Sequence, residues 1–441
     1  MLKRGLSLMM VMLLVAAVVL GCSNNSSTSS DGKDVVTVWT YPVHGEYEAE
    51  LEELIASFEK ENEDIKVEYE VLSWAEGPQK FDIALNSGNP PDVYFGKPQG
   101  KYVDSGLIVN LNDKLNVSQD DYNEVALDYM KIEDNLYGLP IYMFLHVWGG
   151  NKQMLEAAGV DYEKIQQEGW TWDEFEELAS KGVGKKDSGE DTYGFVFQGN
   201  NEELLVHLAM NNGLPSRYTA DGTTWNDDKI LDTMKYISNL VDSGIMPKET
   251  AAVDPAKRME LFYNHQAMFF GRAIPYFDPV VEAHNEEIKA GKIEGEEVDF
   301  VLLPIPHNEG EEQVSFGGSE GYMLFTQKNA KEEHLNNSIK VLEHLTSAEA
   351  GKAAAALALP QVHKDAEGKF EMPLAPYNET AAEVLASKVL PPANASAEMA
   401  AKDDRFRTEV VIPTFQGLLS GELTPEEALE TFKTKGEEIF K

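Results

Sequence analysis

Cysteine is almost absent from this chain of 441 residues, since Cys22 is the only one. A disulfide bond within the chain is therefore impossible. Positive charge is also scarce, because 37 basic residues face 76 acidic ones and the net charge is −39. A surface this acidic repels phosphate backbones and anionic headgroups, so we expect no nucleic-acid partner. The excess charge does not indicate disorder, because 42% of the residues are hydrophobic and 10% are aromatic.

Motifs of metalloproteases and nucleotide-binding proteins are missing from the sequence. It contains no His-Glu-x-x-His and no phosphate-binding glycine loop. The turn-like segments 187–191 and 221–222 lack the full spacing of an EF-hand. We therefore expect no cofactor and no bound metal. One enzyme class stays open, a secreted glycosidase, which needs only two carboxylates set ~5 to 10 Å apart across a sugar site.

The amino terminus has the layout of a secretory signal. Lys3 and Arg4 precede the apolar run 6–20, which is shorter than the ~20 residues needed to span a bilayer. We therefore predict that residues 1–21 are a signal peptide and are removed. This removal changes the net charge from −39 to −41.

Residues 20–22, Leu-Gly-Cys, resemble the processing site of bacterial lipoproteins. The resemblance implies that Cys22 is lipidated and becomes the first mature residue. The segment 22–34 is rich in Ser and Asn and is expected to be a flexible tether. The strongly acidic part of the chain after the tether would contact the membrane only through the lipid on Cys22. The protein would then lie on the outer face of the cell membrane.

The segment 136–150 contains no Asp, Glu, Lys or Arg, although 26% of the chain is charged. Gly138 and Pro140 argue against a continuous helix, so an extended strand is predicted. In a strand, alternate side chains point to opposite faces. One row would hold Tyr142, Phe144, His146 and Trp148, and the other Met143, Leu145 and Val147. Such a strand suits the floor of a cleft.

Alternating strand and helix patterns run along the whole chain and predict an α/β fold. Before the uncharged segment, strands are predicted at 35–40 and 65–71, and helices at 47–61 and 81–85. The segment 88–95 breaks the second helix and enters a short third strand. The order implies a parallel sheet whose ligands lie beyond the carboxyl ends of its strands. Those ends are 39–44, 73–79 and 94–100. About 400 residues after the tether favour two domains over one core.

Several motifs in order resemble the sugar-type bacterial extracellular solute-binding proteins. They are Tyr-Gly-Leu-Pro at 137–140, Asn-Lys at 151–152, Ala-Gly at 158–159, Thr-Trp-Asp-Glu-Phe at 171–175, Ala-Met at 267–268 and Gly-Gly at 317–318. Three positions depart from the family pattern. Gly150 replaces a tyrosine, no tryptophan occurs near Ile274, and Ser319 rather than an aromatic residue follows Gly-Gly.

The resemblance implies a two-lobed fold of the type II periplasmic-binding-protein class, in which crossover strands join two sheets flanked by helices. Lobe 1 would comprise 35–141 and 307–347, and lobe 2 would comprise 142–306 and 348–441. The implied function is capture of a carbohydrate, such as an oligosaccharide, by closure of the lobes. The implied partner is the permease of an ABC importer, and the receptor is expected to be a monomeric non-enzyme.

A sugar site needs aromatic rings to stack on sugar faces and polar groups to bind hydroxyls. The candidates are the aromatic and polar residues of the expected cleft loops. They are Tyr41, His44, Trp74, Gly96, Lys97, Tyr142, His146, Trp148, Asn212, Arg272, Tyr276, Gly318, Ser319 and Glu320.

Other ligands stay possible at this stage. Arg272 and Lys97 would matter more for a glycerol phosphodiester, a peptide or an acidic sugar. Arg272 could instead form a structural ion pair with Glu320 or another of the many acids, and this is the alternative that we favour. Trp170, Trp172 and Trp225 are expected to be packing residues, with Thr171 as a helix cap.

Overall fold

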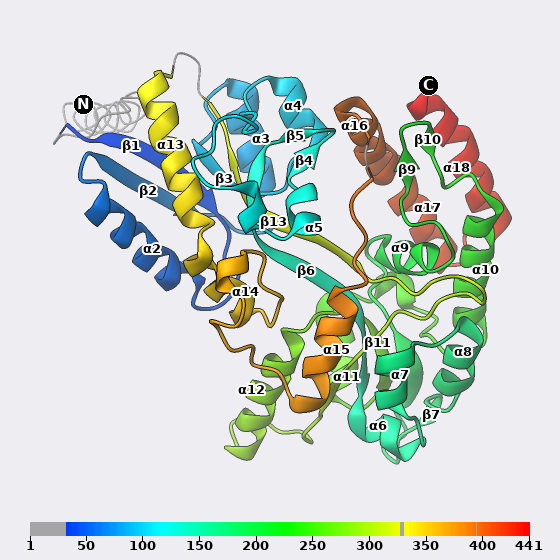
Figure 1. The fold of residues 1–441 in the computed structure, drawn as a ribbon. Coiled ribbons are helices and arrows are strands. Elements are labelled where there is room, and N and C mark those ends of the chain that lie inside the picture. The colour runs from blue at the N-terminus through cyan, green and yellow to red at the C-terminus, as the bar shows by residue number, and fades with distance from the viewer. Residues whose placement is uncertain (1–31, 327–329, 394) are drawn as a thin grey trace, which may run out of the picture.

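The computed structural model describes residues 32–326, 330–393 and 395–441. The predicted signal peptide and Cys22 lie outside these residues, as does the tether up to residue 31. Within the described ranges, no helix is both long and apolar enough to span a membrane. Two lobes lie side by side in Figure 1, and the strand β6 (Gly138–Asn151) runs from one into the other.

The first lobe begins with the predicted order of strands and helices. Its elements are β1 (Asp34–Thr40), α2 (Tyr47–Glu61), β2 (Ile65–Val71), α3 (Gly77–Ser87), β3 (Val93–Gly96), α4 (Gly100–Ser105), α5 (Glu124–Asp128), β4 (Lys131–Ile132) and β5 (Asn135–Leu136). β1 pairs in parallel with both β2 and β3, as the order predicted. Val36 and Val38 are fully buried in this sheet. Gly88 ends α3 in a left-handed conformation that favours glycine.

The second lobe follows β6. Its elements are α6 (Lys152–Ala157), α7 (Tyr162–Glu168), α8 (Trp172–Ser180), β7 (Gly184–Lys185), β8 (Asp191–Val196), α9 (Glu203–Met210), β9 (Tyr218–Thr219), β10 (Gly222–Thr223), α10 (Asp228–Asp242), α11 (Pro255–Tyr263), β11 (Ala267–Ala273), α12 (Phe277–Lys289) and β12 (Phe300–Leu303). Thr171 forms the predicted cap of α8 in a capping box with Glu174. Trp170, Trp172 and Trp225 are buried, which confirms them as packing residues.

The chain then returns to the first lobe and ends on the second. The remaining elements are β13 (Phe316–Leu324), α13 (Glu332–Leu345), α14 (Gly351–Ala356), α15 (Pro376–Ala386), α16 (Ala397–Phe406), α17 (Ile412–Leu419) and α18 (Pro425–Phe440). The helix α16 contacts α4 of the first lobe as well as α18 of the second. It therefore bridges the two lobes, as Figure 1 shows.

β6 belongs to both lobes and joins their strands into one hydrogen-bonded path. Residues 138–146 of β6 pair with β13, which also pairs with β3. Residues 147–151 pair with β11 and β12. The sheet order is β2-β1-β3-β13-β6-β11-β8-β7, with β12 also on β6. We expected a separate sheet in each lobe, but the double use of β6 connects them.

The hydrogen bonds show how the segments near the expected lobe boundaries are paired. The partner of β6 changes between residues 146 and 147, so the first-lobe pairing extends beyond residue 141. Residues 307–314 remain on the second lobe, since His307 bonds to Trp170 and Val314 to Asn211. The helix α14 packs against β6, and its Lys352 pairs with Glu50 on α2. It therefore belongs to the first lobe.

Candidate functional site

An exposed tryptophan lies at the carboxyl edge of the first-lobe sheet. Trp74 is 49% exposed, and its ring stacks on Tyr41 with centroids 4.4 Å apart and planes inclined by 17°. The indole nitrogen of Trp74 donates a hydrogen bond of 3.3 Å to the carbonyl of Pro42. The hydroxyls of Tyr41 and Tyr94 are joined by a 2.7 Å hydrogen bond, and both of these tyrosines are buried. Trp74 is therefore an accessible aromatic platform on a rigid base.

A tyrosine and a carboxylate meet where β6 and β13 pair. Tyr142 lies opposite Glu320 in the register, and its hydroxyl donates a 2.5 Å hydrogen bond to the carboxylate. Burial and the neighbouring Glu320 charge raise the pKa of Tyr142 well above its usual value. Tyr142 therefore remains a hydrogen-bond donor and holds Glu320, which is half-buried, in place.

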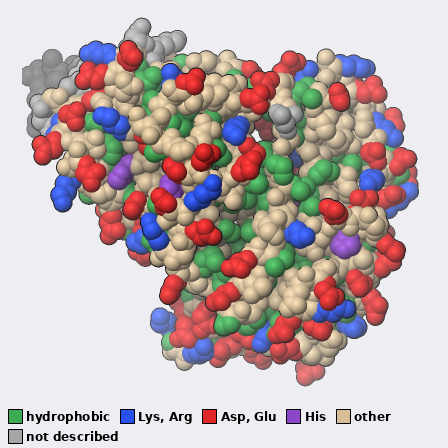
Figure 2. Space-filling view, viewed as in Figure 1, with side chains coloured by type: hydrophobic (Ala, Val, Ile, Leu, Met, Phe, Trp, Pro, Cys, Tyr) green, Lys and Arg blue, Asp and Glu red, His purple; other side chains and the backbone are tan. Residues whose placement is uncertain are grey.

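Three half-buried rings form an aromatic floor on β6 and β13, composed of Phe144, His146 and Phe316. Ring centroids are 5.2 Å apart for Phe144 and His146 and 5.6 Å apart for His146 and Phe316. Gly318 is needed beside this floor, because a Cβ there would lie 2.6 Å from the ring of Phe144. Figure 2 shows hydrophobic side chains gathered between the two lobes on this face.

An ion pair borders the aromatic floor on the second-lobe side. The Glu203 carboxylate accepts a 2.5 Å hydrogen bond from Nδ1 of His146 and lies 2.5 Å from Nε of Arg272. His207, fully buried, lies 3.7 Å from the same carboxylate. Burial alone would raise the pKa of Glu203, but the hydrogen bond from His146 and the nearby imidazole of His207 hold it well below its usual value. Glu203 is therefore ionised, and its partner Arg272 confirms the structural ion pair that we favoured.

Arg272 adopts a backbone conformation that non-glycine residues rarely take, with φ at +53°. It lies in β11 between Phe270 and Ala273, where the pairing with β6 shifts register. The distortion directs the Arg272 side chain, which is 35% exposed, toward Glu203. Backbone strain of this kind gathers at functional sites because the surrounding structure must hold it.

Four predicted site residues are structural instead. Trp148 is fully buried against Phe175 and Phe195. His44 turns toward α2, where its Nε2 is bonded to Glu50 and its Nδ1 accepts from the backbone of Glu46.

Asn212 and Ser319 use their polar atoms internally. The amide of Asn212 bonds to Lys229, Thr233 and Asn308, and its side chain is buried. Ser319 is fully buried and donates to the carbonyl of Tyr142. Residues 317–321 read Gly-Gly-Ser-Glu-Gly, which matches the letters of a Gly-x-Ser-x-Gly nucleophile elbow. However, they lie inside strand β13 rather than at a strand-to-helix turn, so Ser319 is not placed as a nucleophile.

Ligand contact stays a prediction for every candidate, and three of them have not yet been placed. Gly96 ends β3 with φ at +150°, beside Gly321 of β13. Lys97 follows and is exposed. Tyr276 is half-buried just before α12, and no hydrogen bond or ring contact in the described part of the chain joins it to another predicted site residue.

Sequence reasoning missed three groups of this site. Phe144 could have been found, because it stands in the aromatic row between Tyr142 and His146. Phe316 and Glu203 had no local signal, since their partners lie far away in the sequence. Across the described residues, no group of three or more His, Cys, Asp or Glu side chains is arranged to hold a metal ion.

Comparison with known proteins identifies the family. Residues 41–352 match the sequence profile of the bacterial extracellular solute-binding proteins, a range that spans more than half of the chain. The chain belongs to this family. A relative of this solute-binding protein is the multiple sugar-binding protein of Streptococcus mutans, 22% identical over 343 residues that cover 75% of this chain and 76% of that protein.

Solved structures confirm the type II fold of this solute-binding protein. An ABC substrate-binding protein of Listeria monocytogenes in complex with cycloalternan has a TM-score of 0.69 and 21% identity, covering 93% of this chain and 100% of that one. The GacH receptor of Streptomyces glaucescens, studied unliganded and with acarbose, has a TM-score of 0.70 and 18% identity. The match covers 92% of this chain and 98% of that receptor. The two-lobed α/β architecture expected from the sequence is therefore confirmed.

Proposed function

We propose that this protein captures a carbohydrate between its two lobes and delivers it to an ABC importer. The observation that carries the proposal is the aromatic floor of Phe144, His146 and Phe316 beside the ion pair of Glu203 and Arg272. Sugars present apolar C–H faces that pack on rings, and hydroxyls that both donate and accept hydrogen bonds. Trp74 on the first lobe supplies a further platform.

The charges around the floor favour a neutral ligand. Glu203 faces Arg272, so the second-lobe wall holds a compensated pair. On the first lobe, Lys97 and Glu320 contribute one charge of each sign. Because Arg272 is already engaged by Glu203, an acidic ligand would have to compete for it. This arrangement supports a neutral oligosaccharide over the phosphodiester, peptide or acidic sugar that the sequence left open.

The names of related proteins agree with a carbohydrate ligand. Relatives include an arabinooligosaccharide-binding protein of Bacillus subtilis and a diacetylchitobiose-binding protein of Streptomyces coelicolor, 22% and 28% identical over parts of the chain.

We further propose that Cys22 carries a lipid that anchors the protein outside the membrane. Since one chain supplies both walls of the site, we propose that it acts as a monomer.

The charge state of Glu203 does not suit it to be the acid of a glycosidase. A glycosidase needs one carboxylic acid with a raised pKa to protonate the leaving group. The pKa of Glu203 is instead held low by His146 and His207 against the raising effect of burial. Glu203 is therefore suited to accept hydrogen bonds from a ligand rather than to donate a proton to it.

A thermal-shift screen tests the proposal. The chain from Ser30 onward is screened against mono- and oligosaccharides, with peptides and glycerol phosphates alongside. A ligand at ~100-fold over its Kd adds about 2.7 kcal/mol of stability, which raises the melting temperature measurably. We expect a shift with one class of glycan, recovered intact afterwards. A shift with charged ligands alone, or hydrolysis of the glycan, would overturn the proposal.

A further inference from the structure

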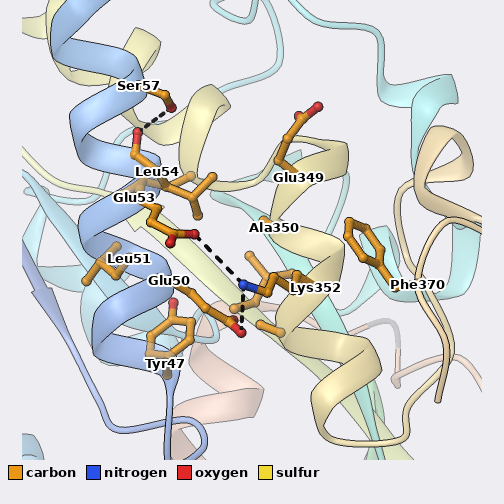
Figure 3. A pocket seen from close by; sticks show the side chains of 13 residues that line it. Tyr47, Glu50, Leu51, Glu53, Leu54, Ser57, Glu349, Ala350, Lys352 and Phe370 are labelled. Carbon is orange, nitrogen blue, oxygen red and sulfur yellow. Dashed lines mark hydrogen bonds and ion pairs between the residues drawn. The ribbon is translucent and has the colours of Figure 1, made fainter. Parts of the chain in front are cut away.

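A cavity of about 300 Å³ lies between α2 and α14 on the first lobe. Figure 3 shows these two helices facing each other across it. The side chains that make it apolar are Leu51, Leu54, Ile141, Leu345, Ala350 and Ala353. Phe370 closes one side. This volume is at the lower end of the range for small-molecule sites, and a mostly apolar lining is typical of them.

The cavity and the proposed carbohydrate site are lined by different residues. None of the residues that line the cavity belongs to the aromatic floor or to the ion pair of Glu203 and Arg272. A ligand in the cavity would therefore occupy a second site, separate from the one proposed for the carbohydrate.

The rim of the cavity carries an excess of negative charge. Three glutamates, Glu50, Glu53 and Glu349, line the cavity together with one lysine, Lys352. Lys352 spans the opening toward the first two, at 3.5 Å from Glu50 and 3.9 Å from Glu53, as the dashed lines in Figure 3 show. These contacts are long, and the Lys352 side chain is 52% exposed. The Glu50 side chain is only 12% exposed and is also bonded to His44 at 3.0 Å.

We propose that this cavity binds a small amphipathic organic cation, consisting of an ammonium group on an apolar body. The ammonium would take the place of Lys352 beside Glu50 and Glu53, while the apolar body packs on the aliphatic floor. Lys352 would then swing into solvent at little cost, because exposed ion pairs contribute little. The excess of negative charge at the rim disfavours an anion and attracts a cation, whereas an uncharged molecule gains nothing from it.

Hexylammonium is a suitable probe, with hexan-1-ol as its uncharged counterpart. Calorimetric titration of the chain from Ser30 onward, which contains every described residue, should show that hexylammonium binds more tightly than the alcohol. Glu53→Gln should weaken the binding of hexylammonium about two- to fivefold, as expected for the loss of one exposed charge pair. Its carboxylate is 79% exposed, so this variant retains the fold. Glu50→Gln should act in the same direction.

Lys352→Ala provides a prediction of opposite sign. Removing the competing ammonium should strengthen hexylammonium binding about two- to fivefold. Ala353→Leu, which fills the cavity, should abolish it. Glu61→Gln, at the exposed end of the same helix, is the matched control and should change nothing. Equal binding of the alcohol, or weaker binding to Lys352→Ala, would overturn the proposal. Unchanged binding to Ala353→Leu would place the amine elsewhere and overturn it as well.

Discussion

At the scale of single residues, the site depends on one strained position. Arg272 holds its left-handed backbone conformation inside a strand while its guanidinium faces Glu203. A left-handed conformation costs a non-glycine residue roughly 1–2 kcal/mol. The ion pair with the carboxylate, whose side chain is only 10% exposed, offsets this cost.

Replacing Arg272 separates these two effects. Arg272→Ala loses the guanidinium but keeps the strain, so we expect a loss of roughly 1–3 kcal/mol in the free energy of unfolding. Arg272→Gly loses the guanidinium and relieves the strain, so it should be about 1 kcal/mol more stable than the alanine variant. Denaturant unfolding measures both. An alanine variant as stable as the glycine variant would contradict the strained conformation.

Trp74 tests the first-lobe side of the carbohydrate site. Trp74→Ala should leave the melting temperature nearly unchanged, because half of the side chain is exposed. It should weaken glycan binding roughly tenfold, since one aromatic platform contributes about 0.5–1.5 kcal/mol beyond its buried area. Trp74→Phe, which keeps a ring on Tyr41, should restore most of the affinity. Calorimetry that finds equal affinity for the alanine variant and the wild type would remove Trp74 from the site.

The sequence allowed part of this site to be predicted. Tyr41 and Trp74 were predicted because they follow strands of the parallel sheet. Tyr142 and His146 were predicted because alternate residues of β6 form one aromatic row. The same alternation placed Trp148 in that row, but only the middle of the row is accessible, because the second-lobe core covers its end. Glu203 could not be predicted, since its role depends on distant partners.

At the scale of elements, the contact between α4 and α16 holds the lobes together. Gly100, at the start of α4, is so close to α16 that a Cβ there would lie 2.2 Å from the carbonyl oxygen of Ala397. Only glycine permits this approach, because a backbone atom cannot move aside as a flexible side chain can.

Gly100→Ala should therefore push α4 away from α16 and favour more open arrangements of the lobes. A glycan held by both lobes should then bind more weakly. Titration with the glycan found in the screen measures the effect. The matched control is Gly184→Ala in β7, where the nearest atom to a new Cβ lies at 3.6 Å. Equal affinities of the two variants would show that the α4–α16 contact does not contribute to binding.

A second element contact depends on pH. His334 on α13 is bonded to Asp92 at 3.0 Å and to Asp34 on β1 at 2.9 Å. The hydrogen bond to Asp92, despite burial, raises the pKa of His334 to about 9 from an ordinary value of 6.5. The protonated histidine therefore ties α13 to the first-lobe sheet.

Because the folded pKa is the higher one, this contribution is fully present below pH 6.5 and is lost as the pH rises through 9. We expect His334→Gln to be less stable than the wild type at pH 6, by about 3 kcal/mol at most. The difference should shrink toward zero near pH 9.5. Denaturant unfolding at both values measures it, and a difference independent of pH would contradict the ionic role of His334.

The elements themselves were largely predictable, because hydrophobic periodicity and caps are local. The helix 47–61 and the strand 65–71 agree residue for residue with α2 and β2. The double pairing of β6 was not predictable, since it depends on which strands return to it from 119 residues or more downstream. For the same reason, the packing of α14 against β6 was not predictable.

At the scale of the whole molecule, the strands of both lobes meet on β6, and the candidate site lies across this junction. His146 is the last residue of β6 paired with the first-lobe strand β13, and it bonds to Glu203 on α9 of the second lobe. A ligand on the aromatic floor would thus touch both lobes. A ligand can contact both lobes at once only when the lobes lie close together. A bound ligand therefore favours the closed arrangement.

Small-angle X-ray scattering with and without saturating glycan tests this account most directly. The chain from Ser30 onward, mixed with the glycan found in the screen, should have a smaller radius of gyration than the free protein. Gly100→Ala should begin from a larger value and become more compact only at higher glycan concentration. Unchanged scattering of the wild-type protein at saturation would contradict capture of the ligand by closure of the two lobes.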